Sequence, residues 1–182
     1  MTDVIQIRMG GYGPPTTTHS RALKFIGDKL EARFGDGVDI KYIWNIMDFG
    51  YRADEILWLT ECGILTLSYQ STSYLTDRVP ELGFVNPLAN TVTYGMHKHH
   101  HFHTLSGHFY LSRGVYGHRE SVDGWPEELR TAMHDAVREA TAYQRGLAVQ
   151  EEDVSQQALV SENCEITELT DAEREAFRAA VT

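Results

Sequence analysis

The sequence VPELGFVNPLANTVTYG, residues 79–95, divides the chain into two parts with different patterns. Before it, short β-branched runs alternate with segments of helical periodicity, which is typical of an α/β lobe. After it, the chain is rich in His and aromatic residues and then becomes helical to its end. This stretch either joins two halves of one binding fold or marks the place where a segment is missing.

The first part predicts alternating strands and helices. Three runs rich in apolar and β-branched residues predict strands, at residues 4–9, 38–44 and 64–69. Two segments with apolar residues at helical spacing predict the helices between them, one from the threonines at 16–18 to Phe34 and one at 51–62. This order predicts a parallel sheet with helices on its faces.

The second part predicts mainly helices. The expected elements are a helix at 87–98, one or two strands within 104–116, a long helix from Pro126 to about Val160 with a kink near Gly146, a short strand at 165–169, and a last helix opened by the capping box of Thr170 and Glu173. We expect one compact domain over residues 1–182, in which residues 1–84 form an α/β lobe of ligand-binding type and residues 85–182 complete it.

The composition disfavours several classes of partner. The 182 residues include 26 acidic and 16 basic side chains, and the formal net charge is −10. We expect no nucleic-acid or anionic-membrane partner, because phosphate contact requires clustered Lys and Arg. Cys62 and Cys164 stand in no metal-binding spacing, so we expect two unpaired thiols, with Cys62 in the core. The chain also shows no signal peptide and no apolar run of the roughly 20 residues that a membrane span requires.

Five histidines fall within seven residues, at positions 97, 99, 100, 101 and 103. Neutral imidazoles bind Zn, Ni or Cu, and His99, His101 and His103 would share one face of a strand. The cluster contains no carboxylate or thiolate and matches no zinc-binding spacing. We therefore expect a His-rich turn, no metal and no cofactor, and keep these three histidines as weak metal-site candidates. No catalytic motif stands in its proper context, so we expect no enzymatic activity.

Two polar loops follow the first and third predicted strands. The first, residues 10–18, contains glycines, prolines and three threonines, and the second, residues 70–74, reads QSTSY. Ligands bind α/β sheets at the carboxyl ends of the strands. The loops therefore predict a ligand-binding edge, with an ordinary solvated turn as the alternative for each.

Several short motifs occur along the chain: ECG at 61–63, SYL at 73–75, VPEL at 79–82, NPLAN at 86–90, WPE at 125–127 and QR at 144–145. Their order resembles that in the DctP-type solute-binding proteins of TRAP transporters. The chain resembles this family over nearly its whole length. The resemblance implies an α/β fold, a periplasmic-binding-protein-like lobe with a mainly parallel sheet plus C-terminal helices.

The resemblance also implies a function. Members of the family capture a small organic acid, a carboxylate, in the periplasm for a membrane permease; a periplasmic location is implied although the chain shows no signal peptide. Members are longer and have two lobes, and most of the second lobe, with the arginine that clamps the carboxylate, is missing here between the counterparts of Phe84 and Asn86. The alternatives are an internally deleted remnant that does not bind solute, a module that forms a homodimer, and a His-cluster metal-binding protein.

The resemblance implies ligand-binding residues in both polar loops and just after residue 85. They are Tyr12, Thr17, Thr18, Tyr69, Gln70, Ser71, Thr72, Tyr74 and Asn86. The expected partners are a small-molecule carboxylate and the membrane permease subunits of a TRAP transporter.

Overall fold

The computed structural model describes residues 4–75, 91–92, 95–106 and 112–181. Its main feature is a four-stranded sheet in the order β2-β1-β3-β5. The strands are β1 (Ile5–Gly10), β2 (Val38–Ile43), β3 (Leu67–Ser71) and β5 (Arg113–Gly117). β1 is parallel to both β2 and β3, as predicted, whereas β5 is antiparallel to β3. Because β5 comes from the second part of the chain, the two parts share one sheet.

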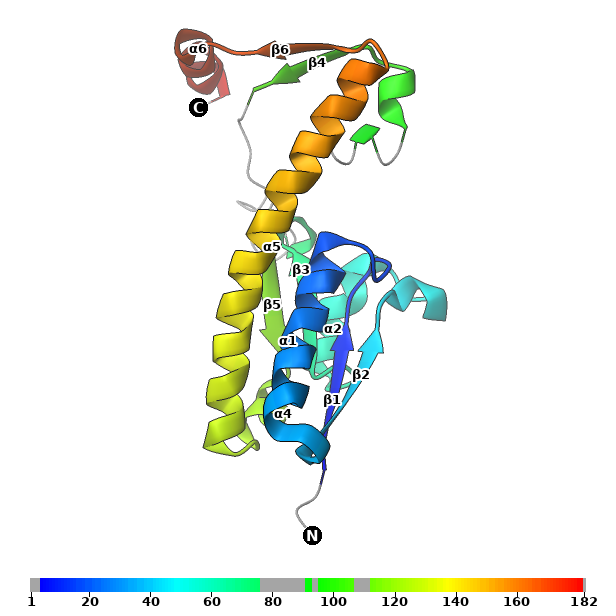
Figure 1. Ribbon diagram of the computed structural model, residues 1–182, viewed down its shortest axis with the longest axis vertical. Coiled ribbons are helices and arrows are strands. Elements are labelled where there is room, and N and C mark those ends of the chain that lie inside the picture. Colours follow the sequence, from blue (N-terminus) through cyan, green and yellow to red (C-terminus); the bar gives the residue numbers. More distant parts are fainter. Residues whose placement is uncertain (1–3, 76–90, 93–94, 107–111, 182) are drawn as a thin grey trace.

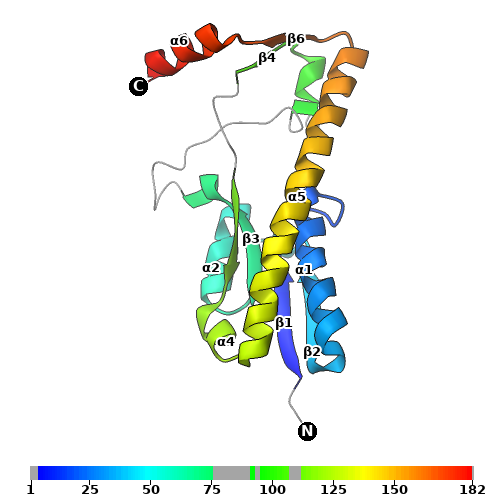
Figure 2. The ribbon, with the colours of Figure 1, turned by 60° about the vertical axis from the view of Figure 1, so that its left-hand side comes forward.

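Two helices cover one face of this sheet, and a shorter helix covers the other (Figure 1). The helices α1 (Thr18–Phe34) and α5 (Glu127–Ser161) lie side by side on the first face, and α2 (Ile56–Glu61) packs against β3 on the second (Figure 2). A short helix, α4 (Arg119–Asp123), leads from β5 into α5. α1 begins where the sequence predicts, because the Thr17 hydroxyl accepts a hydrogen bond from the Ser20 backbone N–H and caps the helix.

The larger hydrophobic core lies between the sheet and the α1–α5 pair. It combines Ile7 and Met9 of β1 with Leu23 of α1 and with Leu129 and Met133 of α5, all of them buried. Residues more than a hundred positions apart thus exclude water together, and the second part of the chain completes the interior of the first. A smaller cluster fills the face under α2; its members are Ile46, Ile56, Leu59 and Leu65.

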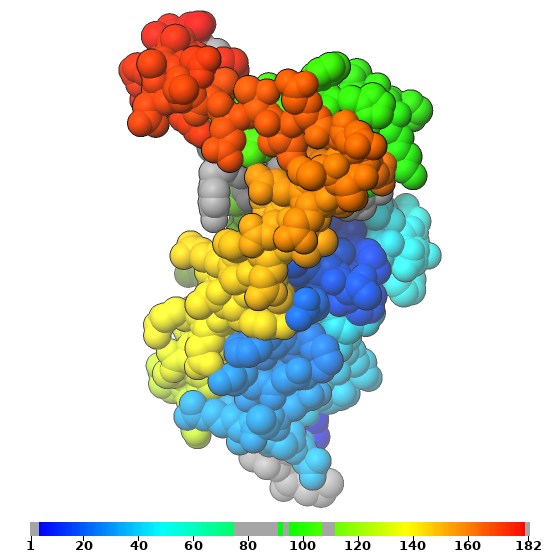
Figure 3. Space-filling view, turned by 45° about the horizontal axis from the view of Figure 1, so that its top comes forward, coloured from blue at the N-terminus to red at the C-terminus, as the bar shows by residue number. Residues whose placement is uncertain are grey.

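α5 continues well beyond the sheet and carries the remaining elements at its far end (Figure 1). There β4 (Phe102–Leu105) pairs in parallel with β6 (Glu165–Glu168), and α6 (Asp171–Val181) follows. In the space-filling view these elements lie beyond the lobe (Figure 3). The far half of α5 exposes Val149, Val154 and Val160, each by more than 60%. The grouping of residues 1–182 as one compact domain stays a prediction.

Some predicted elements have different bounds in the structure. A 3-10 turn, Ala53–Glu55, precedes α2 in the segment where one longer helix was expected. β3 begins at Leu67, three residues later than predicted. The long helix passes Gly146 and is assigned as one element. Of the helix expected at 87–98, residues 87–90 and 93–94 lie outside the described residues, residues 91–92 are helical, and Met96–Lys98 form a 3-10 turn.

The turn between α2 and β3 explains the displaced strand. Gly63 takes a φ of 70°, and the backbone N–H of Thr66 donates to the carbonyl of Arg8 at 2.7 Å. This turn leaves Cys62 exposed, so its predicted core position is wrong. Both cysteines are unpaired, as predicted, and Cys164 is the buried one.

Among the described residues, no helix combines the length and the apolar character that crossing a membrane requires.

The shared core predicts a stability difference between the two halves of α5. Leu129→Ala should lower the free energy of unfolding by about 2–5 kcal/mol, because a 2%-exposed side chain leaves a cavity against β1 and α1. Val149→Ala, on the exposed far half of the same helix, should change it by less than about 0.5 kcal/mol. Urea unfolding followed by circular dichroism measures both. Equal effects of the two substitutions would contradict the shared core.

Candidate functional site

Three tyrosines gather at the carboxyl ends of β1 and β3. The ring centroid of Tyr12 lies 5.1 Å from that of Tyr69 and 5.5 Å from that of Tyr74. The Tyr12 hydroxyl accepts two hydrogen bonds, from the Ser71 backbone N–H at 3.1 Å and from Arg113 Nε at 3.2 Å. The two polar loops thus meet at one edge of the sheet, where they form an aromatic cluster with a guanidinium beside it.

Arg113 reaches this edge through strand pairing. It is the first residue of β5 and pairs with Ser71, the last residue of β3. The antiparallel direction of β5 is therefore what brings the start of this strand to the carboxyl end of its neighbour. Sequence reasoning missed Arg113, because its segment predicted only a generic strand. One sequence signal could have indicated Arg113: it is a single basic residue at the start of a predicted strand in the second part of the chain, and such a strand can join the sheet of the first part.

The charged and titratable groups at this edge influence one another. Burial lowers the pKa of His19 from 6.5 to about 3, and the nearby Arg113 cation adds to this effect. Burial also raises the pKa of Tyr12 above its usual value, although Arg113 opposes the shift. His19 and Tyr12 are therefore uncharged at neutral pH. Within the described part of the chain, Arg113 forms no ion pair, so its charge is not neutralised there by a carboxylate.

Hydrogen bonds at His19 agree with a neutral ring. The amide nitrogen of Gln144, on α5, lies 3.4 Å from His19 Nε2, which can accept a hydrogen bond only when it is unprotonated. The other ring nitrogen, Nδ1, lies 3.5 Å from the Thr18 hydroxyl. The ring also packs on Tyr69, with a centroid separation of 5.7 Å. His19 thus links the start of α1 to the middle of α5 and to the tyrosine cluster.

Gln70 has an unusual environment. Its side chain is 0% exposed, and neither amide atom has a hydrogen-bond partner among the described residues. Neighbouring residues of a strand face opposite sides, so Gln70 lies on the same side as Ser68, whose hydroxyl bonds Thr60 of α2 at 2.8 Å. Gln70 therefore faces α2, whereas Tyr69 faces α1 and α5. A buried amide without partners costs free energy, so this side chain is suited to receive a polar partner.

The other predicted site residues have partners within the protein. The Thr17 hydroxyl caps α1 and donates to the Pro14 carbonyl at 3.1 Å. The Thr72 hydroxyl lies 3.2 Å from the Ser112 carbonyl, to which it donates. Thr18 is buried next to His19. Asn86 lies outside the described residues.

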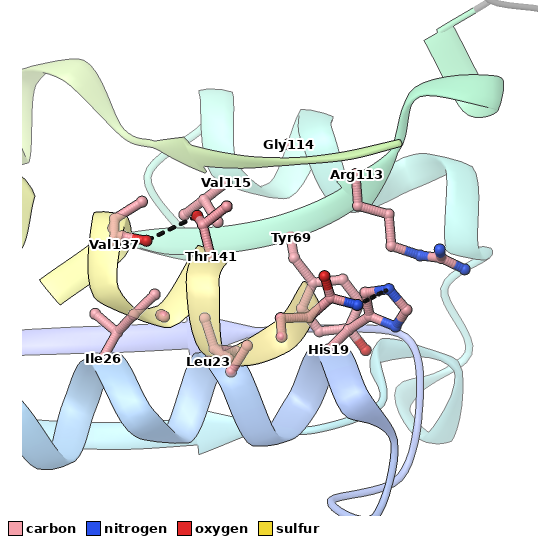
Figure 4. A pocket seen from close by; sticks show the side chains of 12 residues that line it. His19, Leu23, Ile26, Tyr69, Arg113, Gly114, Val115, Val137 and Thr141 are labelled. Atoms are coloured by element: carbon pink, nitrogen blue, oxygen red, sulfur yellow. Dashed lines mark hydrogen bonds between the residues drawn. The ribbon is translucent and has the colours of Figure 1, made fainter. Parts of the chain in front are cut away.

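A cavity of about 70 Å³ lies between α1, α5, β3 and β5 (Figure 4). Its lining residues are His19, Ala22, Leu23, Ile26, Tyr69, Arg113, Gly114, Val115, Val137, Ala140, Thr141 and Gln144. Arg113 and Tyr69 belong both to this lining and to the tyrosine edge. The cavity therefore adjoins the tyrosine cluster at these two side chains.

The histidine cluster lies at the far end of α5. His97 is buried, and its Nε2 lies 3.0 Å from Glu162 Oε2. His101 is exposed, and its Nδ1 lies 4.0 Å from Cys164 Sγ. His99 is exposed as well, and His103 is partly buried on β4. Within the described residues, no group of three or more His, Cys, Asp or Glu side chains is arranged to hold a metal ion.

Comparison with known proteins decides the family. The family model of bacterial extracellular solute-binding proteins, family 7 (DctP), matches residues 83–182, more than half of the chain. The chain belongs to this family. Its members are solute-binding proteins of transport systems and not enzymes, in agreement with the lack of a catalytic motif in the sequence.

One curated relative of this DctP-family chain is the C4-dicarboxylate-binding periplasmic protein DctP of Rhodobacter capsulatus. The two sequences are 34% identical over 101 residues, which is 55% of this chain and 30% of the relative. The matched part of the chain therefore spans less than a third of that protein.

Solved structures of TRAP periplasmic solute-binding proteins share the fold. One from Ochrobactrum anthropi, whose C-terminus is bound in its ligand pocket, aligns with 100% of this chain and 88% of its own, at a TM-score of 0.87 and 12% identity. The structure from Pseudomonas putida F1, with bound D-glucuronate, aligns with 97% of this chain and 91% of its own chain, at a TM-score of 0.80 and 11% identity. The structure from Sulfurospirillum deleyianum, with bound succinate, aligns with 98% of this chain and 92% of its own chain, at a TM-score of 0.75 and 16% identity. The predicted α/β binding-protein fold is thereby confirmed.

The lowered pKa of His19 predicts acid sensitivity. Between pH 6.5 and about 3, the unfolded chain binds a proton at this position that the folded chain does not. The free energy of unfolding should therefore fall as the pH falls through this window, by roughly 1.4 kcal/mol per pH unit from this group. In His19→Gln that part of the slope should disappear. His134→Gln, on the exposed side of α5, is the matched control and should keep it.

Urea unfolding at pH 7, 6, 5 and 4 measures these slopes. Identical pH slopes for wild type and His19→Gln would contradict a neutral, buried His19.

Proposed function

We propose that this chain is a solute-binding component of a TRAP-type transporter and captures a small organic acid at the edge formed by Tyr12, Ser71 and Arg113. The relatives support the substrate class, because their ligands succinate, D-glucuronate and C4-dicarboxylates all carry a carboxylate. The further site residues in this proposal are Thr17, Thr18, Tyr69, Gln70, Thr72, Tyr74 and Asn86. None of them is required to act chemically, since capture is a binding function.

The observation that carries the proposal is an unneutralised guanidinium at the carboxyl edge of the sheet. Arg113 donates through Nε to Tyr12, and the described residues offer its remaining N–H groups no carboxylate. A guanidinium presents donors in a fork that matches a carboxylate, so an acid can accept two parallel hydrogen bonds there. The surrounding hydroxyls and the neutral His19 add no competing negative charge.

The electrostatics of the whole chain favour a local anion site only at such a place. The net charge of −10 repels anions over most of the surface. A half-buried Arg113, in contrast, acts through a low-dielectric surrounding in which its charge is less screened. α1 begins at Thr18, next to His19 of the same edge, so the positive end of its helix dipole lies nearby.

The proposed location and partner follow from the relatives. The Rhodobacter capsulatus protein is periplasmic, and the solved structures are of TRAP periplasmic proteins. We therefore place the capture step in the periplasm and assign the membrane permease subunits of a TRAP transporter as the protein partner. A homodimer that does not bind solute remains the competing outcome of the test below.

Isothermal titration calorimetry tests the proposal with succinate, D-glucuronate and pyruvate as probes. At least one acid should bind the wild type, and Arg113→Gln should weaken that binding at least thirtyfold, because a desolvated carboxylate would lose its charged partner. Arg119→Gln is the matched control. This arginine is exposed on α4 and, among the residues that the structure describes, pairs with Asp123 at the surface, so its loss should change affinity by less than about twofold.

Two results would count against the proposal. If Arg113→Gln binds the acid as tightly as the wild type does, the carboxylate is not held at Arg113. Absence of heat for all three acids, together with a dimer by light scattering, would favour a non-binding assembly module.

A further inference from the structure

The cavity beside Arg113 has a polar end and an apolar end. In the close view, Arg113, His19 and Tyr69 lie towards one end, and Ile26 and Val137 lie towards the other (Figure 4). The hydroxyl of Thr141 already donates to the carbonyl of Val137 at 2.8 Å, so it offers little to a guest. The cavity therefore combines one charged, hydrogen-bonding end with a hydrocarbon wall.

The size of the cavity suits a short branched alkyl group. A single water requires roughly 10–15 Å³ of such space, so about 70 Å³ holds roughly five to seven non-hydrogen atoms. Water molecules would find few polar partners at the apolar end, which is walled by Leu23, Ile26 and Ala140. An apolar group gains most by replacing water at such a place.

We propose that this cavity receives the apolar tail of a monocarboxylate whose carboxylate is held at Arg113. The inference rests on the proposed function and narrows it to acids with a branched aliphatic substituent. It separates this chain from the relatives that bind succinate and D-glucuronate, because those molecules carry a second carboxylate or several hydroxyls.

The lining residues disfavour a second charge at the apolar end. Arg113 is the sole Lys or Arg among the twelve lining residues, and the other basic side chain, His19, is neutral at pH 7. A second carboxylate directed past Leu23 towards Val137 would lose its hydration without gaining a cation, which costs free energy. An alkyl chain suffers no such penalty, so the cavity selects monocarboxylates over dicarboxylates.

Three small molecules of related shape test the inference by calorimetry and by thermal shift. They are 4-methylpentanoate, propanoate and the neutral 4-methylpentanamide. Each buried CH₂ group improves affinity about fourfold, so 4-methylpentanoate, with three more carbons, should bind the wild type roughly 50-fold more tightly than propanoate. It should also bind more tightly than succinate.

A cavity-filling substitution locates the tail. Ala140→Leu places three extra carbons in the cavity and should remove the advantage of 4-methylpentanoate over propanoate, while propanoate binding changes less than threefold. Ala142→Leu, at an exposed position of the same helix, is the matched control and should keep that advantage. Ala22→Val fills the cavity from α1 and should act like Ala140→Leu, so it replaces that variant if Ala140→Leu does not fold.

The outcomes separate this inference from the proposed function. If both acids bind with equal affinity in the wild type, or if Ala140→Leu and Ala22→Val keep the preference, the tail site is wrong and carboxylate capture stands. If no acid binds but 4-methylpentanamide raises the melting temperature of the wild type and not of the filled variants, the apolar cavity stands and carboxylate capture is wrong. If none of the three molecules binds, the tail site is wrong, and binding of succinate, D-glucuronate or pyruvate then decides whether carboxylate capture stands.

Discussion

The antiparallel pairing of β5 with β3 is the interaction on which the rest of the structure depends. It places Arg113 opposite Ser71 and thereby gives the proposed ligand-binding edge its cation. It also directs the chain through α4 into α5, whose apolar side packs against α1 and the sheet. Without this pairing, β3 would be an edge strand, the core would lack one wall, and the tyrosine cluster would have no guanidinium beside it. Fold and site therefore have the same origin.

Burial sets the chemical character of the site. Burial lowers the pKa of His19 to about 3 and raises the pKa of Tyr12, so both groups are uncharged at neutral pH. Arg113 stays the local positive charge in a chain with a net charge of −10. A cation in such surroundings favours an anionic ligand without any catalytic group. The adjoining cavity would add selectivity for the shape of the ligand, because its lining is mainly hydrocarbon away from Arg113. A binding role is thus the natural outcome of this arrangement.

The elements that depend on local signals could be predicted from the sequence, and those that depend on distant pairing could not. The Thr17 cap and the apolar stripe of α1 specify that helix on their own, and the parallel order of the first three strands follows from their alternation with helices. β5 pairs with β3, which lies more than forty residues earlier in the chain. The spacing of apolar residues along the sequence does not indicate such a distant pairing. Arg113 was missed for this reason, while Tyr12, Tyr69, Ser71 and Tyr74 were placed at one edge because two strand ends must meet there. Cys62 was misplaced because an apolar residue at the end of a short helix carries no sign of the exposed turn that follows.

Native-state hydrogen exchange tests the central claim most directly. If β5 completes the lobe, the ladder amides of β1, β3 and β5, such as those of Met9, Tyr69 and Tyr116, should exchange with one common opening free energy close to that of global unfolding. If the amides of β5 exchange freely while those of β1 and β3 stay protected, β5 is not a permanent strand of the sheet, and the origin assigned here to both the core and the site is wrong.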